Sequence, residues 1–285
     1  MISGLDHVVI AVRDLDAAMR AYGTLLGRSP SWRAEATGGG AEVAAFGLAN
    51  VGVELIAPAG DGPMAGRLRA ALDAEGEGLA SLAFMVDDIA RAHRRLARLA
   101  LAPEPVAAAE SMDRVSAARR RWQRTRASTT ATHGVRIFLI EPETPLPRSP
   151  AVEGETASVS GLDHVVVRTP DPERAAALYG ARLGLDMRLD RSNAEWGSRL
   201  MFFRCGDLIV EIAHDLRAGV SSGPDRLWGL SWRVPDAEAA HRRLAAAGAD
   251  VTTVRPGRKP GTRVFTVRDG TCGVPTLVLE PTPAA

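Results

Sequence analysis

Hydrophobic and polar positions near the start of the chain follow first a strand-like and then a helix-like pattern. Residues 5–12, LDHVVIAV, form a β-branched run of strand length. Residues 13–27, RDLDAAMRAYGTLLG, have acidic residues in their first turn and Ala, Met and Leu at helical spacing, and they end at a glycine. Three further strand-like runs follow, separated by Gly-rich turns. The pattern therefore predicts a βαβββ module.

This module is repeated along the chain. A shift of 157 residues (164 − 7) places His7 on His164 and Glu54 on Glu211. Each half repeats again, because residues 78–100 and 228–249 echo the opening segment and share the sequence AHRRLA. An internal repeat of this kind predicts four modules in two similar halves.

The modules predict a domain organisation. One βαβββ unit is too small to bury the face of its own sheet, so modules should pair. The run of prolines after the second module predicts an extended, stiff linker. We expect an N-terminal domain over 1–145 (modules 3–75 and 78–145), a Pro-rich linker over 146–159, and a C-terminal domain over 160–285 (modules 160–222 and 226–282).

Composition narrows the class of protein. A chain of 285 residues with 46% hydrophobic and 24% charged residues is typical of a soluble globular protein of about two domains. The net charge of +1 gives no general attraction to nucleic acid or to a membrane surface. The two cysteines have no metal-type spacing, and no apolar run approaches the length of a membrane span, so we expect a cytoplasmic protein.

The strand pattern DHV-x-(I/V)-x-V-x-D, the helix pattern with Tyr and Leu-Gly, and the four βαβββ modules resemble the vicinal oxygen chelate superfamily. That superfamily includes glyoxalases, extradiol dioxygenases and bleomycin-binding proteins. The resemblance covers nearly the whole chain. It implies an α+β fold in which modules pair into U-shaped mixed sheets. It also implies a divalent metal (Zn, Ni, Fe, Mn or Co) in the cup of the U, held by His and Glu from the first and last strands of each module.

The resemblance assigns four candidate metal ligands, namely His7, Glu54, His164 and Glu211. Modules two and four lack these residues and carry Ser81, Phe138, Gly229 and Leu277 instead. If module one pairs with two or with four, each cup holds one His and one Glu, which is fewer than the three or four ligands of a tight site. Only a pairing of modules one and three, within the chain or between subunits, would gather all four.

Two other readings of these residues stay open. The histidines could be structural residues at the strand edge, or the glutamates Glu54 and Glu211 could act as acid or base without a metal. We interpret the Asp before each His as a strand-entry residue.

Other candidates lie outside this set. If residues 119–126 form a strand, Arg120, Trp122 and Arg124 share one face and predict a pocket for an anionic ligand; the alternative is a solvated edge strand. Arg199 is a further candidate cup arginine that would bind substrate or pair with the cup glutamate. His133, in a turn before the last strand of module two, could serve as a catalytic acid or base, or simply cap its hairpin.

The leading functional hypothesis is a metal-dependent lyase, isomerase or dioxygenase of the glyoxalase/dioxygenase type. It would act on a small oxygen-rich, aromatic or anionic substrate through an enolate or oxyanion intermediate. The alternative is a metal-free binding protein of the bleomycin-resistance type. No Gly-rich phosphate loop is present, so no nucleotide cofactor is expected. The expected partner is a small molecule and neither nucleic acid nor a membrane, and a homodimer is one option.

Overall fold

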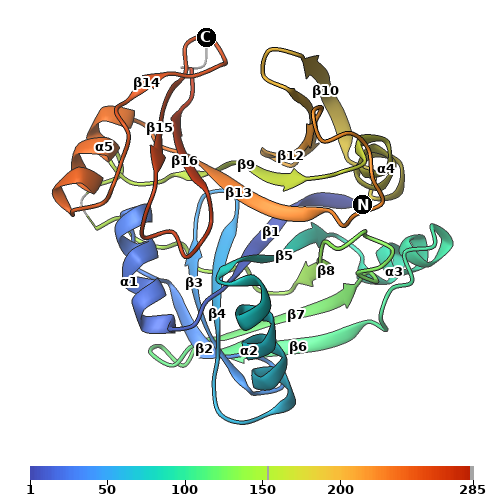
Figure 1. Ribbon diagram of the computed structural model, residues 1–285. Coiled ribbons are helices and arrows are strands. Elements are labelled where there is room, and N and C mark those ends of the chain that lie inside the picture. The colour runs from blue at the N-terminus through green and yellow to red at the C-terminus, as the bar shows by residue number, and fades with distance from the viewer. Residues whose placement is uncertain (153, 283–285) are drawn as a thin grey trace.

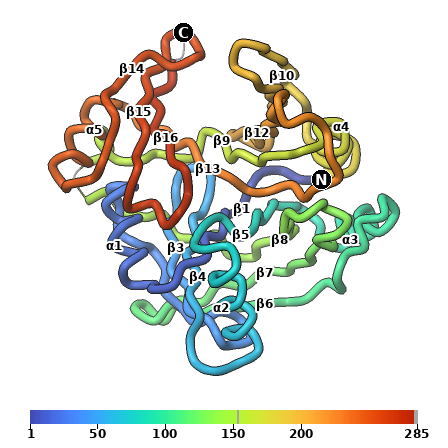
Figure 2. The backbone as a smooth tube through the Cα atoms, in the orientation of Figure 1, coloured from blue at the N-terminus to red at the C-terminus, as the bar shows by residue number. Residues whose placement is uncertain are grey.

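Each half of the chain forms one eight-stranded mixed sheet in the computed structural model, which describes residues 1–152 and 154–282 (Figures 1 and 2). The N-terminal sheet has the order β2-β3-β4-β1-β5-β8-β7-β6 and the C-terminal sheet the order β10-β11-β12-β9-β13-β16-β15-β14. The strands of the first sheet are β1 (Ile2–Ala11), β2 (Trp32–Glu35), β3 (Ala41–Gly47), β4 (Gly52–Pro58), β5 (Gly78–Val86), β6 (Ala107–Met112), β7 (Arg119–Arg126) and β8 (Ile137–Pro142). Those of the second are β9 (Gly161–Arg168), β10 (Asp186–Asn193), β11 (Ser198–Cys205), β12 (Leu208–Asp215), β13 (Arg226–Arg233), β14 (Arg255–Pro256), β15 (Arg263–Val267) and β16 (Thr276–Glu280).

The strand order shows how the modules pair. The first strands of modules one and two, β1 and β5, run antiparallel at the centre of the first sheet, and β9 and β13 do the same in the second. Each is flanked by the last strand of its own module, in parallel. Module one therefore pairs with two, and three with four. The expected fold class, α+β with βαβββ modules paired into curved mixed sheets, is confirmed.

The helices lie on the outer sides of the sheets (Figure 1). They are α1 (Leu15–Leu26), α2 (Pro63–Glu75), α3 (Ile89–Arg98), α4 (Pro172–Ala176), the π-helical turn η1 (Ala177–Arg182) and α5 (Ala237–Ala246). Asp14 caps α1, because its side chain accepts a hydrogen bond from the backbone N–H of Ala17, and Gly27 ends the helix in the left-handed conformation. No helix of the described residues is long and apolar enough to cross a membrane.

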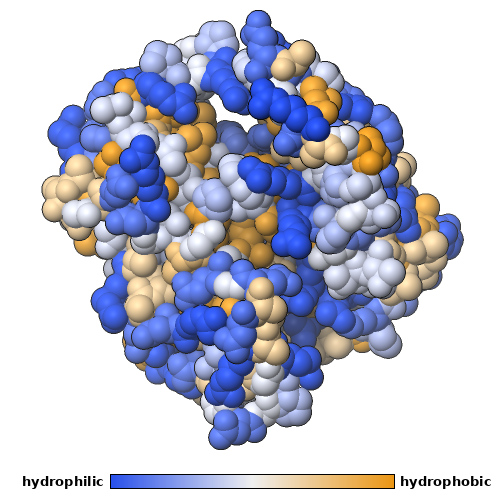
Figure 3. All heavy atoms as spheres, viewed as in Figure 1, coloured by the Kyte–Doolittle hydropathy of each residue, from blue (hydrophilic) through white to orange (hydrophobic). Residues whose placement is uncertain are grey.

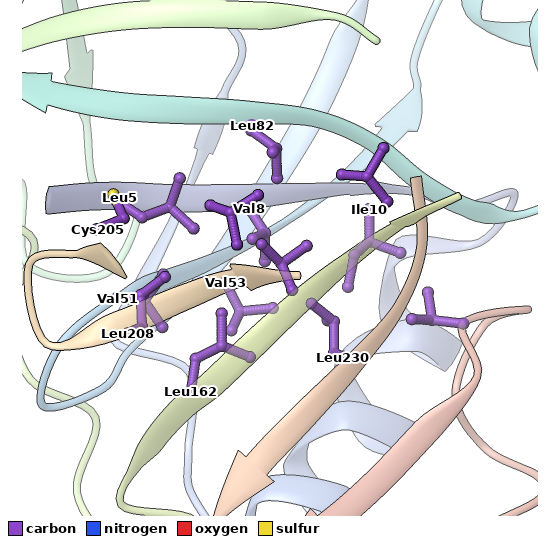
Figure 4. Close-up of a cluster of buried hydrophobic side chains, with 14 of the residues drawn as sticks. Leu5, Val8, Ile10, Val51, Val53, Leu82, Leu162, Cys205, Leu208 and Leu230 are labelled. Carbon is purple, nitrogen blue, oxygen red and sulfur yellow. The ribbon is translucent and has the colours of Figure 1, made fainter. Parts of the chain in front are cut away.

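One hydrophobic core joins the two halves. Leu5, Val8 and Ile10 of β1 belong to the same buried cluster as Leu162 and Leu230 of the second half (Figure 4). Strand β1 contacts β11, and β5 contacts β13, so the two sheets pack against each other. Side chains alternate along a strand, so His7 projects from the face of β1 opposite to Val8 and Ile10, and His164 from the face of β9 opposite to Val165 and Val167. We call these two concave faces the N-terminal cup and the C-terminal cup. A bulge between Leu5 and His7 lets Leu5 reach the core as well.

The segment between the sheets packs on the N-terminal half. Arg28 is buried, and its guanidinium donates to the carbonyl oxygens of Val159 (2.6 Å) and Ser149 (2.9 Å) and pairs with Glu155. A Cβ at Gly47 would collide with the carbonyl of Pro147, so only glycine permits this close approach. The expected stiff linker is thus held in place along its length by contacts with the first half.

Candidate functional site

The Asp-His pair at the start of each half has the same geometry in both sheets. His7 Nδ1 lies 2.6 Å from Asp6 Oδ2, and His164 Nδ1 lies 2.8 Å from Asp163 Oδ2. An ionised carboxylate can only accept, so Nδ1 carries the proton and Nε2 of the neutral ring is left as an acceptor facing the cup. Our interpretation of the Asp as a strand-entry residue missed this orienting role. A carboxylate directly beside a candidate histidine was the sequence signal for it.

In the C-terminal cup, two side chains converge on Nε2 of His164. Ser231 Oγ lies 2.7 Å from Nε2, and Glu211 Oε2 lies 3.4 Å from it. Burial raises the pKa of Glu211, although the charges of His164 and Arg258 act against the rise. The carboxyl of Glu211 therefore keeps its proton to higher pH than usual, beside an imidazole nitrogen that can take it up. This arrangement can move a proton.

In the N-terminal cup the same His and Glu have different neighbours. The position across from His7 on β5 is Ala83, whereas the position across from His164 on β13 is Ser231. Burial acts to lower the pKa of His7, but the hydrogen bond with Asp6 and the charges of Glu54 and Asp6 raise it overall. This cup therefore has no hydroxyl at the position of Ser231.

The arginine-rich strand β7 faces the N-terminal cup. Arg120 Cζ lies 5.7 Å from the ring centroids of both Trp32 and Trp122, and burial lowers the pKa of this guanidinium against the charges of Asp6 and Glu54. Arg124 Cζ lies 5.7 Å from the ring of Phe138. Arg120 and Arg124 thus lie in the same cup as His7, and Arg120 brings a positive charge close to Asp6 and Glu54.

The four candidate metal ligands lie in two separate sites. His7 and Glu54 belong to the first sheet, and His164 and Glu211 to the second. Among residues 1–152 and 154–282, no three His, Cys, Asp or Glu side chains come together in a way that could hold a metal. The single four-ligand site that a pairing of modules one and three would form is therefore not present among the described residues. Two protein ligands in each cup do not fit a tightly bound resident metal.

Two other candidates lie elsewhere. Arg199 pairs with Glu173 of α4 (2.6 Å) and Asp190 of β10 (2.7 Å), on the helix side of its sheet, so the expectation of a cup arginine is wrong. The reason is register: across β11 and β12, Phe202 stands opposite Glu211, and Arg199 is out of phase with it. His133 lies in a turn with φ of 56°, and its carbonyl accepts a hydrogen bond from the backbone N–H of Asp225 (2.7 Å). It joins the two halves and does not reach a cup rim.

The N-terminal cup is sealed at its edges. The edge strands β2 and β6 are bridged, because Trp32 Nε1 donates to Ser111 Oγ (2.8 Å). The segments that follow them are also joined, since the N–H of Arg114 donates to the carbonyl of Arg33 (2.7 Å). Trp32 packs in a small apolar cluster with Ala34, Val43 and Ala45, and Leu146 of the linker joins that cluster.

The C-terminal cup is open in comparison. Its two arms, β10–β11 and β14–β15, stand apart in Figure 1, and Figure 3 shows the surface hollowed between them. The arms touch at their tips, where Arg258 Cζ lies 4.3 Å from the ring centroid of Trp196. Ser231 and Arg258 were not singled out from the sequence. The signal for Ser231 was its position two residues after Gly229, on the same face of the strand.

Two cavities lie outside both cups. One of about 680 Å³ lies between α1 and the loop that joins β15 to β16, and includes Cys272. Burial raises the pKa of that thiol to about 11, so it is an unreactive cysteine at neutral pH. The other, of about 600 Å³, lies between α1, the linker at Val152 and the C-terminal part of α5. Neither contains a His-Glu pair.

Family comparisons give a consistent result over both halves. The model of the glyoxalase-like domain matches residues 5–161. The model of the glyoxalase/bleomycin resistance protein/dioxygenase superfamily matches residues 163–266. No curated protein matches the chain.

Solved structures share the fold at low identity. A mutant of 4-hydroxymandelate synthase from Streptomyces coelicolor is 18% identical, with a TM-score of 0.72, over 99% of this chain and 94% of that one. The Mn(II)-bound glyoxalase from Novosphingobium aromaticivorans is 14% identical, with a TM-score of 0.66, over 99% of this chain and 83% of that one. A catechol 2,3-dioxygenase is 16% identical, with a TM-score of 0.62, over 100% and 90%.

Proposed function

Because the chain belongs to the vicinal oxygen chelate superfamily, with a glyoxalase-like domain in its first half, we propose that it is an enzyme that transfers a proton on a small oxygen-rich molecule in its C-terminal cup. The observation that carries the proposal is the 3.4 Å separation between Nε2 of His164 and Oε2 of Glu211, together with the hydrogen bond that fixes the other ring nitrogen on Asp163. A carboxyl with a raised pKa beside an oriented imidazole is a suitable acid–base pair.

The proton movement can be written for a molecule with a C–H next to a carbonyl. The ionised Glu211 takes the carbon-bound proton, and the electron pair of the C–H bond moves to the carbonyl oxygen to give an enolate. The proton can then pass to Nε2 of His164, and the imidazolium that forms is stabilised by the carboxylate of Asp163. The hydroxyl of Ser231, released from Nε2, is free to donate to the enolate oxygen. Return of the proton to carbon or oxygen completes an isomerisation.

The N-terminal cup is not the proposed site. Its His7 lacks a hydroxyl partner, Arg120 places a positive charge beside Glu54, and the edge strands and Leu146 close it. In this proposal Arg120 interacts with the carboxylates of Asp6 and Glu54, and Arg124 packs on the ring of Phe138. Both arginines then have partners within the protein in place of the predicted external anion.

A metal-dependent enzyme is the second candidate. His164 and Glu211, 3.4 Å apart, would be the protein ligands of such a metal. Because two protein ligands are too few for a tight site, the metal would be held weakly and would need further ligands from the bound molecule. A metal-free protein that only binds its ligand is the third reading.

Proton exchange separates these functions. The purified protein is incubated in D2O with a panel of small hydroxy- and keto-carbonyl compounds, and deuterium incorporation at carbon is followed by NMR with and without EDTA. We expect exchange that survives EDTA and falls at least about 100-fold in His164→Gln. The matched variant His7→Gln should retain at least half of the activity.

Each other outcome contradicts the proposal. Exchange that EDTA abolishes and one equivalent of Mn(II) or Zn(II) restores would favour the metal-dependent enzyme. Binding of a compound without exchange would favour the sequestering protein. Equal losses in the two histidine variants would place the chemistry outside the C-terminal cup.

A further inference from the structure

The opening of the C-terminal cup carries two arginines on one tryptophan. Trp196 lies in the turn between β10 and β11, with 38% of its surface exposed. Arg258 Cζ, from the turn between β14 and β15, lies 4.3 Å from the centroid of its ring, and Arg191 Cζ of β10 lies 5.1 Å from it. Two guanidinium groups that come from different arms therefore meet at one aromatic side chain.

Neither of these guanidinium groups forms an ion pair with an acidic side chain in the described part of the chain. The ion pairs between described side chains include neither Arg191 nor Arg258, although neighbouring arginines such as Arg188 and Arg199 are paired. Glu195 lies in the same turn as Trp196 and also forms no ion pair with them. Both guanidinium groups lie within about 5 Å of the same indole ring, so an anion bound beside that ring would be attracted by both charges.

Further positive charge surrounds the same tips. The guanidinium of Arg217 lies against Gly197, where a Cβ would come within 2.8 Å of its Nε. Lys259 follows Arg258 in the opposite turn. The charge of Arg258 also reaches the interior of the cup, because it acts on the carboxyl of Glu211. The tips therefore belong to the same cup as Glu211, and their positive charge is felt at its carboxyl.

We propose that Arg191, Arg258 and Trp196 form an anion site at the opening of the C-terminal cup, and that the molecule acted on carries a carboxylate or phosphate group next to a flat or apolar part. The guanidinium groups would hold the anionic group by forked hydrogen bonds, and the indole would pack on the flat part. The inference about the substrate rests on the proposed function of His164 and Glu211. The inference that an anion binds at Arg191 and Arg258 is independent of that function.

Binding of a simple aromatic acid tests the site. Benzoate is titrated into the full-length protein by calorimetry, with benzamide as the uncharged molecule of the same shape and inorganic phosphate as the anion without a ring. We expect benzoate to bind at least about tenfold more tightly than benzamide, with an affinity that falls as salt concentration rises. The double variant Arg191→Gln/Arg258→Gln should lose at least about tenfold in benzoate affinity. Both side chains are exposed, so the variant should fold normally.

The matched control is Arg188→Gln, which removes the same charge from the same strand but from an arginine already paired with Asp186 at 2.8 Å. It should bind benzoate within twofold of the unmodified protein. Phosphate should compete with benzoate, which would show that the anionic group is what the site recognises. Equal binding of benzamide and benzoate, undiminished binding in the double variant, or no binding of either anion at 20 mM would each overturn the proposal.

The variant His164→Gln separates the two proposals. It should bind benzoate as the unmodified protein does, because the anion site lies at the tips of the arms. If proton exchange is absent from every protein while benzoate still requires Arg191 and Arg258, the anion site stands and the proposed chemistry fails. If exchange depends on His164 but the double variant exchanges anionic and neutral compounds equally well, the chemistry stands and the substrate class fails.

Discussion

The two cups begin with the same residues and differ in what surrounds them. Each holds an Asp-His pair on its first strand and a Glu on a neighbouring strand, at positions 157 residues apart (164 − 7). The N-terminal cup adds Arg120 and closes over it with Trp32, whereas the C-terminal cup adds Ser231 and stays open between its arms. The comparison teaches that a retained His and Glu do not by themselves define a site. The side chains across from them decide whether a ligand can reach them.

Removal of the Trp32 side chain, which helps to close the N-terminal cup, should have the largest effect on stability. Trp32 is 4% exposed, and its counterpart in the second half, Leu189 (32 + 157), is 48% exposed. We expect Trp32→Ala to lower the free energy of unfolding by about 3–5 kcal/mol, because it leaves a cavity and removes the bond to Ser111. Leu189→Ala should cost less than about 1 kcal/mol. Urea denaturation measures both, and equal losses would mean that the two cups are closed alike.

Removal of the Ser231 hydroxyl should destabilise the protein less than Trp32→Ala does, and its effect should be confined to the C-terminal cup. It is 3% exposed and hydrogen-bonded to His164, so Ser231→Ala should lower the free energy of unfolding by about 1 kcal/mol. Ser81, the buried serine on β5, forms no side-chain hydrogen bond among the described residues and is the control. Its replacement by Ala should cost less than about 0.5 kcal/mol. Thermal and urea unfolding of the two variants would show whether the pairing is real.

The contributions of Glu211 and Asp6 to the free energy of unfolding should change in opposite directions as pH rises. Burial raises the pKa of Glu211 above 4.5, so the folded protein holds this proton more tightly, and stability falls as pH rises through the folded value. For Asp6, burial would raise the pKa, but the hydrogen bond with His7 and the charges of His7 and Arg120 lower it below 3.8. Its contribution is therefore present above pH 3.8 and is lost as pH falls.

Two amide variants test this difference. Glu211→Gln should raise the melting temperature relative to the unmodified protein at pH 7 and leave it almost unchanged at pH 4. Asp6→Asn should lower the melting temperature at pH 7, and the difference should shrink as the solution is acidified. The same pH trend in both variants would mean that the carboxyls do not differ in the way the structure shows.

The smallest expected effect is an electrostatic one. The charge of Arg120 acts to lower the pKa of His7, so Arg120→Leu should raise that pKa further. Proton NMR of the imidazole C–H signal of His7 against pH measures this change. An unchanged His7 pKa in the variant would contradict the placement of Arg120 inside the N-terminal cup.

Much of the fold could be predicted from local patterns in the sequence. The strand and helix periods of residues 5–27 and their repetition at 160–184 gave the module and its copies, because these signals depend on neighbouring residues alone. The pairing of modules depends on contacts between β1 and β5, far apart in the chain, and it stayed open until the structure fixed it.

The candidate site was less predictable for the same reason. His7, Glu54, His164 and Glu211 were found from their positions in the modules, but their grouping requires knowledge of which sheets form. Arg199 was misplaced because the face of a strand depends on register, and one residue of phase moves a side chain from the cup to the helix side. Ser231 and Arg258 come from strands and turns of module four, and only the folded chain brings them to His164 and Trp196.

The buried Arg28 has a practical consequence for dividing the protein. Its guanidinium binds the backbone at both Ser149 and Val159, so residues 146–159 are part of the N-terminal folding unit and not a spacer between two units. We expect a fragment that stops at residue 145 to lose the partners of Arg28 and the packing of Leu146 on the Trp32 cluster, and to be less stable than a fragment that continues to residue 160. Both fragments expose the face of β1 that packs on the second half, so neither should be as stable as the full chain.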